Sequence, residues 1–522
     1  MLQLQRFCFL LVVALLPLNS LSVVFPLNIL GGGFANKASF YPAFAGMALA
    51  IYGEIRWGGI FADLRTFRNY LAVYLSVILL STVNGLWNYP YYAAIKLPEL
   101  GRLPGLLASV GFEPPLDAAA AIYIGLRVIK NNVLSTIYTF GTAYWIYCLF
   151  RRDAAAGIRI LQRGIAIALV AIFSYSCVEL AYLAGSGNAK TMLQTVNPWL
   201  YQVKSAHNWW PPLLWPNQVR SVFAEPSFFG IYIAFALPFL WQRLLSRRLA
   251  DCLVLLGLTV LLFLTKARTA VLLFLGQFSL LAFSTLLLKR REYLFRLGLV
   301  GLVSAAAFAV SAFFINTFAG GQQPLGVAGT IKHYVNDNVE SVADPAKRSN
   351  QSRYSVILAD LRIGLDNPVL GVGIGLRDAY VPQHFSSASL KNIEIKNWVR
   401  LQKKEGILQS TIPKLCEYSA RFAETGSIGL LVFLLPLLQL GRKMHLAYKL
   451  AEQQEKDNLL VFAISLLAVC AAGFSNTLDI NYCYWVLLGL GYALCAKKAA
   501  ADRLEKESGA NDERTNCSGT LH

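Results

Sequence analysis

The sequence predicts an all-α polytopic membrane protein. Of its 522 residues, 56% are hydrophobic and only 15% are charged, whereas about a quarter of the residues are charged in soluble domains. Apolar runs of about 20 residues recur along the chain, which is the length that an α-helix needs to cross a bilayer. Because backbone groups in lipid must be paired within the protein, these runs are expected to be helices.

About twelve transmembrane helices are expected. The first apolar run follows Arg6 and ends without a clear small-residue cleavage site, so it is interpreted as an uncleaved helix rather than a signal peptide. The twelve predicted segments are 7–29, 38–54, 67–88, 131–150, 160–184, 228–245, 250–265, 269–288, 295–317, 426–441, 459–475 and 480–497.

Basic residues fall in alternate loops, which indicates a fixed orientation in the membrane. With the N-terminus in the cytoplasm, clusters such as Arg151 and Arg152 lie in cytoplasmic loops, and both termini are cytoplasmic. The net charge of +18 is then explained by topology and contact with anionic membrane lipids, and nucleic acid is not expected as a partner. The five histidines show no metal-ligand spacing, so neither a metal site nor a cofactor is expected.

Three predicted outer segments are long enough to indicate function. They cover about 89–130, 186–227 and 318–425. The third resembles a small inserted helical domain. The expected organisation is nine helices in 1–317, a large outer loop at 318–425, three helices in 426–497 and a disordered cytoplasmic tail at 498–522.

An aromatic stretch, WWPPLLWP, lies in the second outer segment and contains Trp209, Trp210 and Trp215. Tryptophans next to a membrane helix are typical of an aromatic belt at the membrane–water interface. They are also suited to stacking against sugar rings, and both interpretations stay open.

The third outer segment contains a predicted helix that ends at Asn367-Pro368 and is followed by GVGIG. Gly371, Gly373 and Gly375 match a dinucleotide fingerprint weakly, because the required strand is missing. The three glycines are interpreted as allowing close backbone approach or a tight turn beside a substrate.

Three arginines are expected at the outer face beside apolar sequence: Arg220, Arg268 and Arg353. Each has a structural explanation, such as pairing of Arg220 with Glu225 or extension of Arg268 to lipid headgroups. Taken together they predict one converging anion site, because a guanidinium binds phosphate bidentately and keeps its charge. Pro226 suits the first turn of a helix whose N-terminus adds positive potential, and Glu225 beside it could accept a proton.

Four segments resemble motifs of one family, in the same order along the chain. They are RSVFAEPSFFG, FLTKARTAVLL, NPVLGVGIG and FAETGSIGLLVFLL. They look like motifs of the O-antigen polymerase/ligase superfamily of integral membrane glycosyltransferases, over roughly residues 165–495. Ala267 stands where the family usually has serine.

The resemblance implies a GT-C-like fold and a substrate class. The substrate would be an oligosaccharide linked to undecaprenyl diphosphate, at the periplasmic face of the bacterial inner membrane. Transfer would be inverting and metal-independent, with Arg220, Arg268 and Arg353 binding the diphosphate. Whether a chain-length regulator protein is a further partner is left open.

The resemblance favours a polysaccharide polymerase over a ligase. Ligases of this superfamily carry a His-Asn pair about nine residues before the Glu-x-Gly segment, where this chain has Leu415 and Cys416. Ligase activity stays the alternative within the enzymes, and a flippase or transporter for lipid-linked sugars is the alternative in another class. Glu225 is the first candidate for the general base. The weaker candidates are Glu417, Glu424 and His384.

Overall fold

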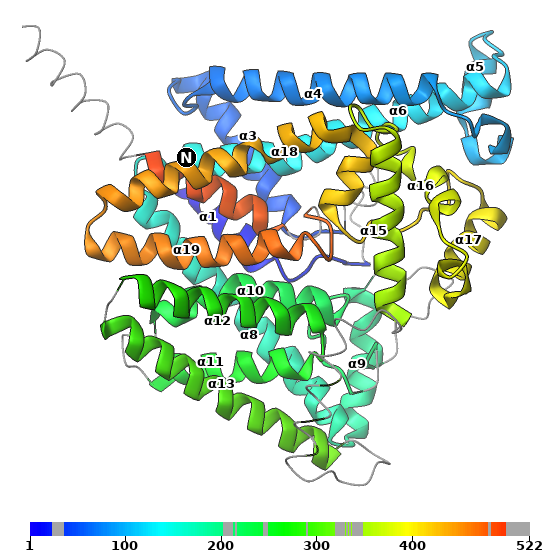
Figure 1. The fold of residues 1–522 in the computed structure, drawn as a ribbon. Coiled ribbons are helices and arrows are strands. Elements are labelled where there is room, and N and C mark those ends of the chain that lie inside the picture. Colours follow the sequence, from blue (N-terminus) through cyan, green and yellow to red (C-terminus); the bar gives the residue numbers. More distant parts are fainter. Residues whose placement is uncertain are drawn as a thin grey trace, which may run out of the picture.

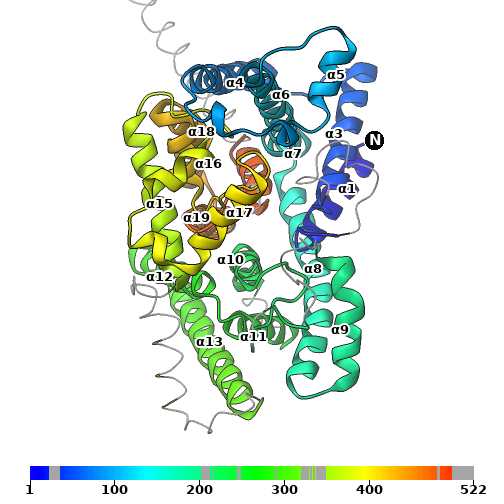
Figure 2. The ribbon, with the colours of Figure 1, turned by 90° about the vertical axis from the view of Figure 1, so that its right-hand side faces the viewer.

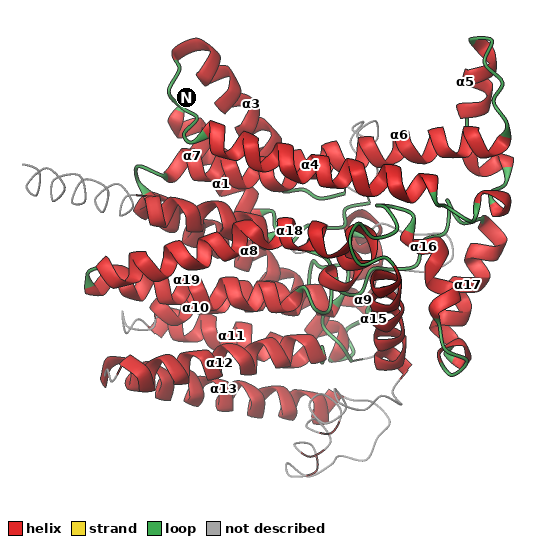
Figure 3. Cartoon of the chain, turned by 45° about the horizontal axis from the view of Figure 1, so that its top comes forward, coloured by secondary structure: helices red, strands yellow, loops and turns green. Residues whose placement is uncertain are grey.

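The computed structural model describes most of the chain, and all its regular elements are helices in that part (Figure 3). The described residues are 1–22, 36–201, 212–214, 217–243, 249–288, 291–318, 329, 332, 336, 348–478 and 482–496. The predicted sugar-stacking residues Trp209, Trp210 and Trp215 and the predicted tail 498–522 lie outside these ranges.

Helices form the body of the molecule, and many but not all of them run roughly parallel to one another (Figure 1). They are α1 (Leu2–Ala14), α3 (Phe40–Trp57), α4 (Leu64–Trp87), α6 (Leu116–Thr136), α7 (Thr142–Phe150), α8 (Ala154–Leu183), α10 (Pro226–Arg243), α11 (Leu249–Leu264), α12 (Arg268–Leu288), α13 (Arg291–Phe318), α18 (Glu417–Leu450), α19 (Gln453–Ala472) and a last helix at Cys483–Ala496.

Shorter elements gather at one end of this bundle, on the right in Figure 1. They are the 3-10 turns Tyr92–Ala94, Leu97–Leu100, Val381–His384 and Ser389–Lys391 and the helices α5 (Leu103–Ser109), α9 (Gly187–Leu200), α15 (Arg348–Asp366), α16 (Arg377–Tyr380) and α17 (Ile393–Glu405). This part is called the loop-rich end below. It is built from the described parts of all three segments that the sequence analysis predicted as long outer loops.

Helices lie at all twelve predicted apolar segments, and six of them are long and apolar enough to cross a membrane. These six are Leu64–Trp87, Leu116–Phe150, Ala154–Leu183, Arg268–Leu287, Leu294–Ile315 and Glu417–Leu450. An integral membrane protein follows from these helices, while the number of twelve crossings stays a prediction.

Two of the predicted boundaries differ most from the structure. The first helix ends at Ala14 instead of continuing to residue 29, because Pro17 disfavours helical geometry in the residue before it and cannot donate a helical hydrogen bond. The segment 89–130 is not a loop throughout, since α6 starts at Leu116 and continues through a π-turn at Ile137–Gly141 into α7. Its alanine-rich start favours a helix, although its charged residues interrupt the apolar pattern.

Helix α10 lies in the middle of the molecule (Figure 2). It packs against α11, α12 and α19, and nearly all of its side chains are buried. A helix that is apolar on all sides is stable only when it is surrounded by protein or lipid. Its first residue is Pro226, so the segment RSVFAE directly precedes this buried helix.

Candidate functional site

The segment before α10 is held by a buried carboxylate on α8. Glu179 accepts hydrogen bonds from the backbone N–H groups of Ser221 at 2.8 Å and Arg220 at 3.4 Å. Ser221 has a φ of 54°, which non-glycine residues rarely adopt, and its carbonyl accepts a hydrogen bond from the Tyr201 hydroxyl at 2.5 Å. These contacts offset the cost of the strained turn. Glu179 was missed in the sequence analysis, although a lone carboxylate in the apolar run CVELAYL was a usable signal.

The Arg220 guanidinium is buried against an aromatic ring. Its central carbon lies 3.8 Å from the centroid of the Tyr201 ring, and Nη1 donates to the Ala224 carbonyl at 3.3 Å. A cation over an aromatic face is stabilised without losing its charge. Arg220 is therefore fixed in direction and still supplies a full positive charge to its surroundings.

Glu225 lies within the electrostatic reach of two of the predicted arginines. Its Oε2 accepts a hydrogen bond from the Ser227 hydroxyl at 3.1 Å, inside the first turn of α10. Burial raises the pKa of the Glu225 carboxyl, and the Ser227 hydrogen bond and the charges of Arg353 and Arg220 counteract part of that rise.

Arg268 and Arg353 approach the same place from α12 and α15. Nη1 of Arg268, the first residue of α12, donates to Oδ1 of Asn350 at 2.7 Å, and Nη1 of Arg353 donates to the Ser475 carbonyl at 2.6 Å. Burial lowers the pKa of the Arg353 guanidinium; the nearby Glu225 carboxylate raises it and the nearby Arg268 charge lowers it further. The structure thus brings Arg220, Glu225, Arg268 and Arg353 together, and these four residues are called the arginine cluster.

The glycine-rich loop after α15 packs directly on the backbone of α18. Val372 and Gly373 donate backbone hydrogen bonds to the carbonyls of Ala423 and Glu424, both at 2.9 Å. Gly371 has a φ of 65°, and a Cβ atom there would lie 2.4 Å from the Glu424 carbonyl carbon. Only glycine allows this approach. α18 itself bends at Gly426, close to the place where the sequence predicted the membrane segment 426–441 to begin.

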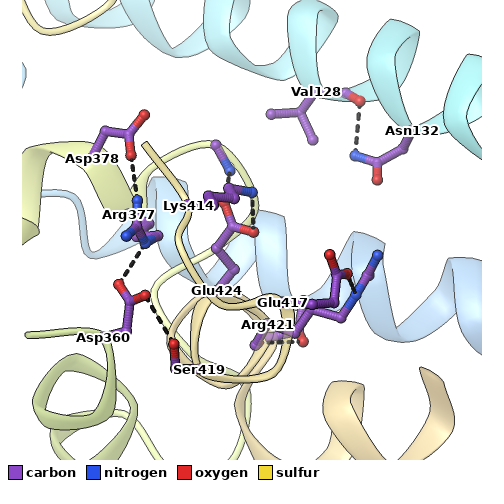
Figure 4. Close-up of polar contacts among 12 residues, drawn as sticks. Val128, Asn132, Asp360, Arg377, Asp378, Lys414, Glu417, Ser419, Arg421 and Glu424 are labelled. Atoms are coloured by element: carbon purple, nitrogen blue, oxygen red, sulfur yellow. Dashed lines mark hydrogen bonds and ion pairs between the residues drawn. The ribbon is translucent and has the colours of Figure 1, made fainter. Parts of the chain in front are cut away.

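A cavity of about 520 Å³ lies beside this loop, between α6, the first turns of α18 and the segment before α18. Two ion pairs stand in its wall (Figure 4): Lys414 Nζ lies 2.6 Å from Glu424 Oε2, and Arg421 pairs with Glu417. Glu424 also accepts a hydrogen bond from the Gly375 N–H at 3.1 Å. This space is called the α6–α18 cavity.

A buried arginine holds the elements around this cavity together. Nε of Arg377 lies 2.5 Å from Oδ1 of Asp360 on α15, and its Nη1 lies 2.8 Å from Oδ1 of Asp378, which lines the cavity (Figure 4). The Ser419 hydroxyl of α18 donates to the same Asp360 at 3.2 Å. Removing one member of such a buried group leaves an uncompensated charge, so the group fixes α15, α16 and α18 relative to one another.

The three weaker candidates for the general base lie in two different parts of the structure. Glu417 and Glu424 line the α6–α18 cavity, each engaged by a basic side chain. His384 lies apart from the residues that line it, with Nε2 3.0 Å from Oδ2 of Asp366 and Nδ1 2.9 Å from the Tyr380 carbonyl. Among the residues that the structure describes, no group of three or more His, Cys, Asp or Glu side chains is suited to hold a metal ion.

One short segment joins the arginine cluster to the α6–α18 cavity. The Ser475 carbonyl accepts from Arg353, Thr477 lines the cavity, and the Leu478 N–H donates to Oε2 of Glu417 at 3.0 Å. The two regions are therefore two residues apart along the chain at this point, at Ser475 and Thr477.

The helices and the charged loop-rich end define an integral membrane protein with a polar, charged site at one end of its bundle. The family model described as O-antigen ligase matches residues 253–398, from α11 into α17, and this range contains Arg268, Arg353 and the three loop glycines. The match confirms the resemblance to the O-antigen ligase/polymerase superfamily, whose members are glycosyltransferase-like enzymes. No curated protein matches the sequence.

Proposed function

We propose that this protein is a polysaccharide polymerase that transfers a glycan from undecaprenyl diphosphate to a lipid-linked acceptor. The arginine cluster is the observation that carries the proposal. Three arginines and Glu225 share a partly buried place at the starts of α10, α12 and α15, and the charge of Glu394 on α17 also acts on Arg353. The hydrogen-bond acceptors of Arg268 and Arg353 among the described residues are an amide and a backbone carbonyl, so the charge of both remains available to an anion.

The proposed reaction needs no metal ion. The acceptor hydroxyl oxygen forms a bond to the anomeric carbon, and the bond from that carbon to the diphosphate oxygen breaks. The diphosphate leaves with the electron pair, and attack from the opposite face inverts the anomeric centre. Guanidinium groups placed where this negative charge develops stabilise the transition state.

Glu225 is the proposed acceptor of the hydroxyl proton. A general base works best when its pKa is close to the working pH, and burial moves the pKa of Glu225 upward from its ordinary value. The Ser227 hydrogen bond and the charges of Arg353 and Arg220 counteract part of this rise in the pKa. Glu417 and Glu424 are less suitable, because proton uptake by either would weaken an existing ion pair. His384 stays a weaker alternative because it lies apart from the arginine cluster and the cavity.

Ligase activity is the second candidate, because the matching family model carries that description. In this chain the place of the ligase His-Asn pair is taken by Leu415 and Cys416, next to Lys414, whose ammonium is occupied by Glu424. An ion-paired lysine is a poor substitute for a histidine base at neutral pH. The polymerase is therefore favoured.

The proposed location is the bacterial inner membrane, with the loop-rich end in the periplasm and both termini in the cytoplasm. Basic residues in the predicted inner loops support this orientation. A tag inserted at residue 380 should be accessible from the periplasm, and a tag at residue 510 only from the cytoplasm. Cytoplasmic labelling of residue 380 would place the proposed site on the wrong face.

The reaction is tested with purified protein in lipid bilayers, supplied with repeat units on undecaprenyl diphosphate. A ladder of longer lipid-linked glycans is expected, and EDTA should leave the ladder unchanged. Transfer of single or preformed chains to a different lipid acceptor, without lengthening, would indicate a ligase. A loss of product in EDTA that a divalent ion restores would contradict the arginine mechanism.

A further inference from the structure

The α6–α18 cavity carries charges that are balanced within its own wall. Its ionisable lining residues are three basic and three acidic ones: Arg127, Lys414, Arg421, Asp378, Glu417 and Glu424. Lys414 pairs with Glu424, Arg421 with Glu417, and Asp378 with the buried Arg377. Nη1 of Arg127 donates to the Leu408 carbonyl at 2.6 Å. The wall is therefore strongly polar without an excess of either sign.

A charged ligand fits such a wall poorly. A carboxylate or phosphate group at Lys414 or Arg421 would have to draw that cation away from its own carboxylate and leave the carboxylate poorly solvated in the wall. At Arg127, which bonds to a backbone carbonyl, the same group would face the three carboxylates of the wall. An uncharged ligand with many hydroxyl groups has no such conflict, because it can donate to carboxylate oxygens and accept from ammonium or guanidinium groups without breaking the pairs.

Neutral polar side chains complete the lining on the side of α6. Asn131, Asn132 and Ser135 follow one another along this helix and face the ion pairs of α18 across the cavity. Tyr74 and Tyr89 add aromatic surface. The volume of about 520 Å³ is within the range of pockets that enclose small organic ligands.

We infer that the α6–α18 cavity binds an uncharged saccharide unit of the glycan substrate. The inference rests on the proposed function, because segment 475–478 places this sugar next to the arginine cluster that would hold the diphosphate. It adds a selectivity: the unit bound here is a neutral hexose or N-acetylhexosamine, and a uronic acid is disfavoured.

Soluble disaccharides test the cavity separately from the transfer reaction. Binding to the full chain in nanodiscs is measured by NMR saturation transfer and calorimetry with cellobiose, lactose and N,N′-diacetylchitobiose. Cellobiouronic acid serves as the charged counterpart of cellobiose. At least one neutral disaccharide should bind at millimolar concentration, and cellobiouronic acid should bind about tenfold more weakly than cellobiose, the effect of roughly one lost hydrogen bond.

Two variants assign the binding to this cavity. Ser135→Leu and Asn132→Leu each extend an apolar side chain into the space and should weaken disaccharide binding about tenfold or more. Arg353→Ala should leave disaccharide binding unchanged while it abolishes polymerisation, because a free sugar carries no diphosphate. Elution as a single species in gel filtration and an unchanged melting temperature are required of each variant.

The inference is overturned if no member of the panel binds, if cellobiouronic acid binds as tightly as cellobiose, or if both cavity variants bind like the unaltered protein. These outcomes leave the proposed function standing as long as the unaltered protein lengthens lipid-linked glycans. Conversely, disaccharide binding without any glycan lengthening would refute the polymerase and keep the saccharide site.

Discussion

The arginine cluster and the α6–α18 cavity lie at the same end of the bundle but treat charge in opposite ways. In the cluster, Arg220, Arg268 and Arg353 are accompanied by Glu225, and the two guanidiniums of Arg268 and Arg353 bond to uncharged acceptors. In the cavity, basic and acidic side chains are equal in number, and Lys414 and Arg421 form close pairs with Glu424 and Glu417. The first region is suited to an anion that supplies the missing negative charge, and the second to a neutral polar molecule.

The two regions also differ in how their charges affect the stability of the folded protein. Burying a charge without an opposite charge is expensive, and in the cluster the nearby carboxylates Glu225 and Glu394 offset part of that cost at Arg353. The pairs in the cavity are satisfied in the folded protein and need no ligand. The arginine cluster is therefore the better candidate for the proposed diphosphate site, and the predictions below test the two regions against each other.

The largest effect is expected for Glu225→Gln. Glu225 is the proposed acceptor of the proton, and the side-chain amide in the Glu225→Gln protein cannot accept it. The polymerisation rate should therefore fall by about 100- to 10,000-fold. In the unaltered protein the rate should rise with pH, because only the ionised carboxylate accepts a proton. The inflection should lie above the ordinary glutamate pKa of 4.5, since burial raises the pKa of Glu225.

The pH–rate profile and the ladder assay provide the measurement. Glu405→Gln, on the exposed surface of α17, is the matched control and should keep the normal rate and profile. A Glu225→Gln protein that polymerises normally would move the base to Glu417, Glu424 or His384, and two of these would place it in the cavity instead of the cluster.

A smaller loss of polymerisation rate is expected for Arg268→Lys. This substitution keeps the positive charge but removes the planar guanidinium group, whose N–H donors can bind a phosphate bidentately. Losing one charge-assisted contact of about 3 kcal/mol in the transition state corresponds to a rate loss on the order of a hundredfold. Arg362→Lys, at an exposed position of α15, should leave the rate unchanged. Equal rates for both variants would show that the cluster does not recognise diphosphate through Arg268.

The smallest effect concerns stability at the border of the cavity. Gly371→Ala places a Cβ atom 2.4 Å from the Glu424 backbone in a left-handed conformation, so the loop and α18 must separate. Strain of this kind costs roughly 1–3 kcal/mol. The melting temperature in detergent should fall, whereas Gly441→Ala, at a helical position with open space around it, should leave it unchanged or slightly higher. Equal melting temperatures would show that the loop does not support the cavity.

The residues of the arginine cluster could be predicted from the sequence, mainly because charged residues are rare beside apolar segments. Arg220, Arg268 and Glu225 were identified because each interrupts or borders a hydrophobic run, and Arg353 because it opens the predicted helix before the NPVLGVGIG motif; both are local properties of the sequence. The cavity was not identified. Lys414 and Arg127 are ordinary polar loop and helix residues in the sequence, and their meeting with α18 and residue 408 depends on how distant helices pack.

The ends of two helices were also predicted incorrectly from the sequence pattern. The start of α6 was assigned to a loop because its polar positions dilute the apolar pattern, yet its helix continues into α7. α1 ends before its apolar run does, because the backbone restriction from Pro17 outweighs the hydrophobic character of the following residues.

The sequence by itself determined the class of the molecule: helices long and apolar enough for a membrane, and motifs that resemble those of the O-antigen ligase/polymerase superfamily. These follow from local composition and spacing, which a short stretch of chain contains completely. The tertiary structure decided which groups meet. Ser81 donates to the carbonyls of both Leu370 and Glu424, and Arg377 joins α15 to α16, contacts that sequence spacing does not encode. Such contacts form only when packing brings distant segments together, so their partners became known only from the fold.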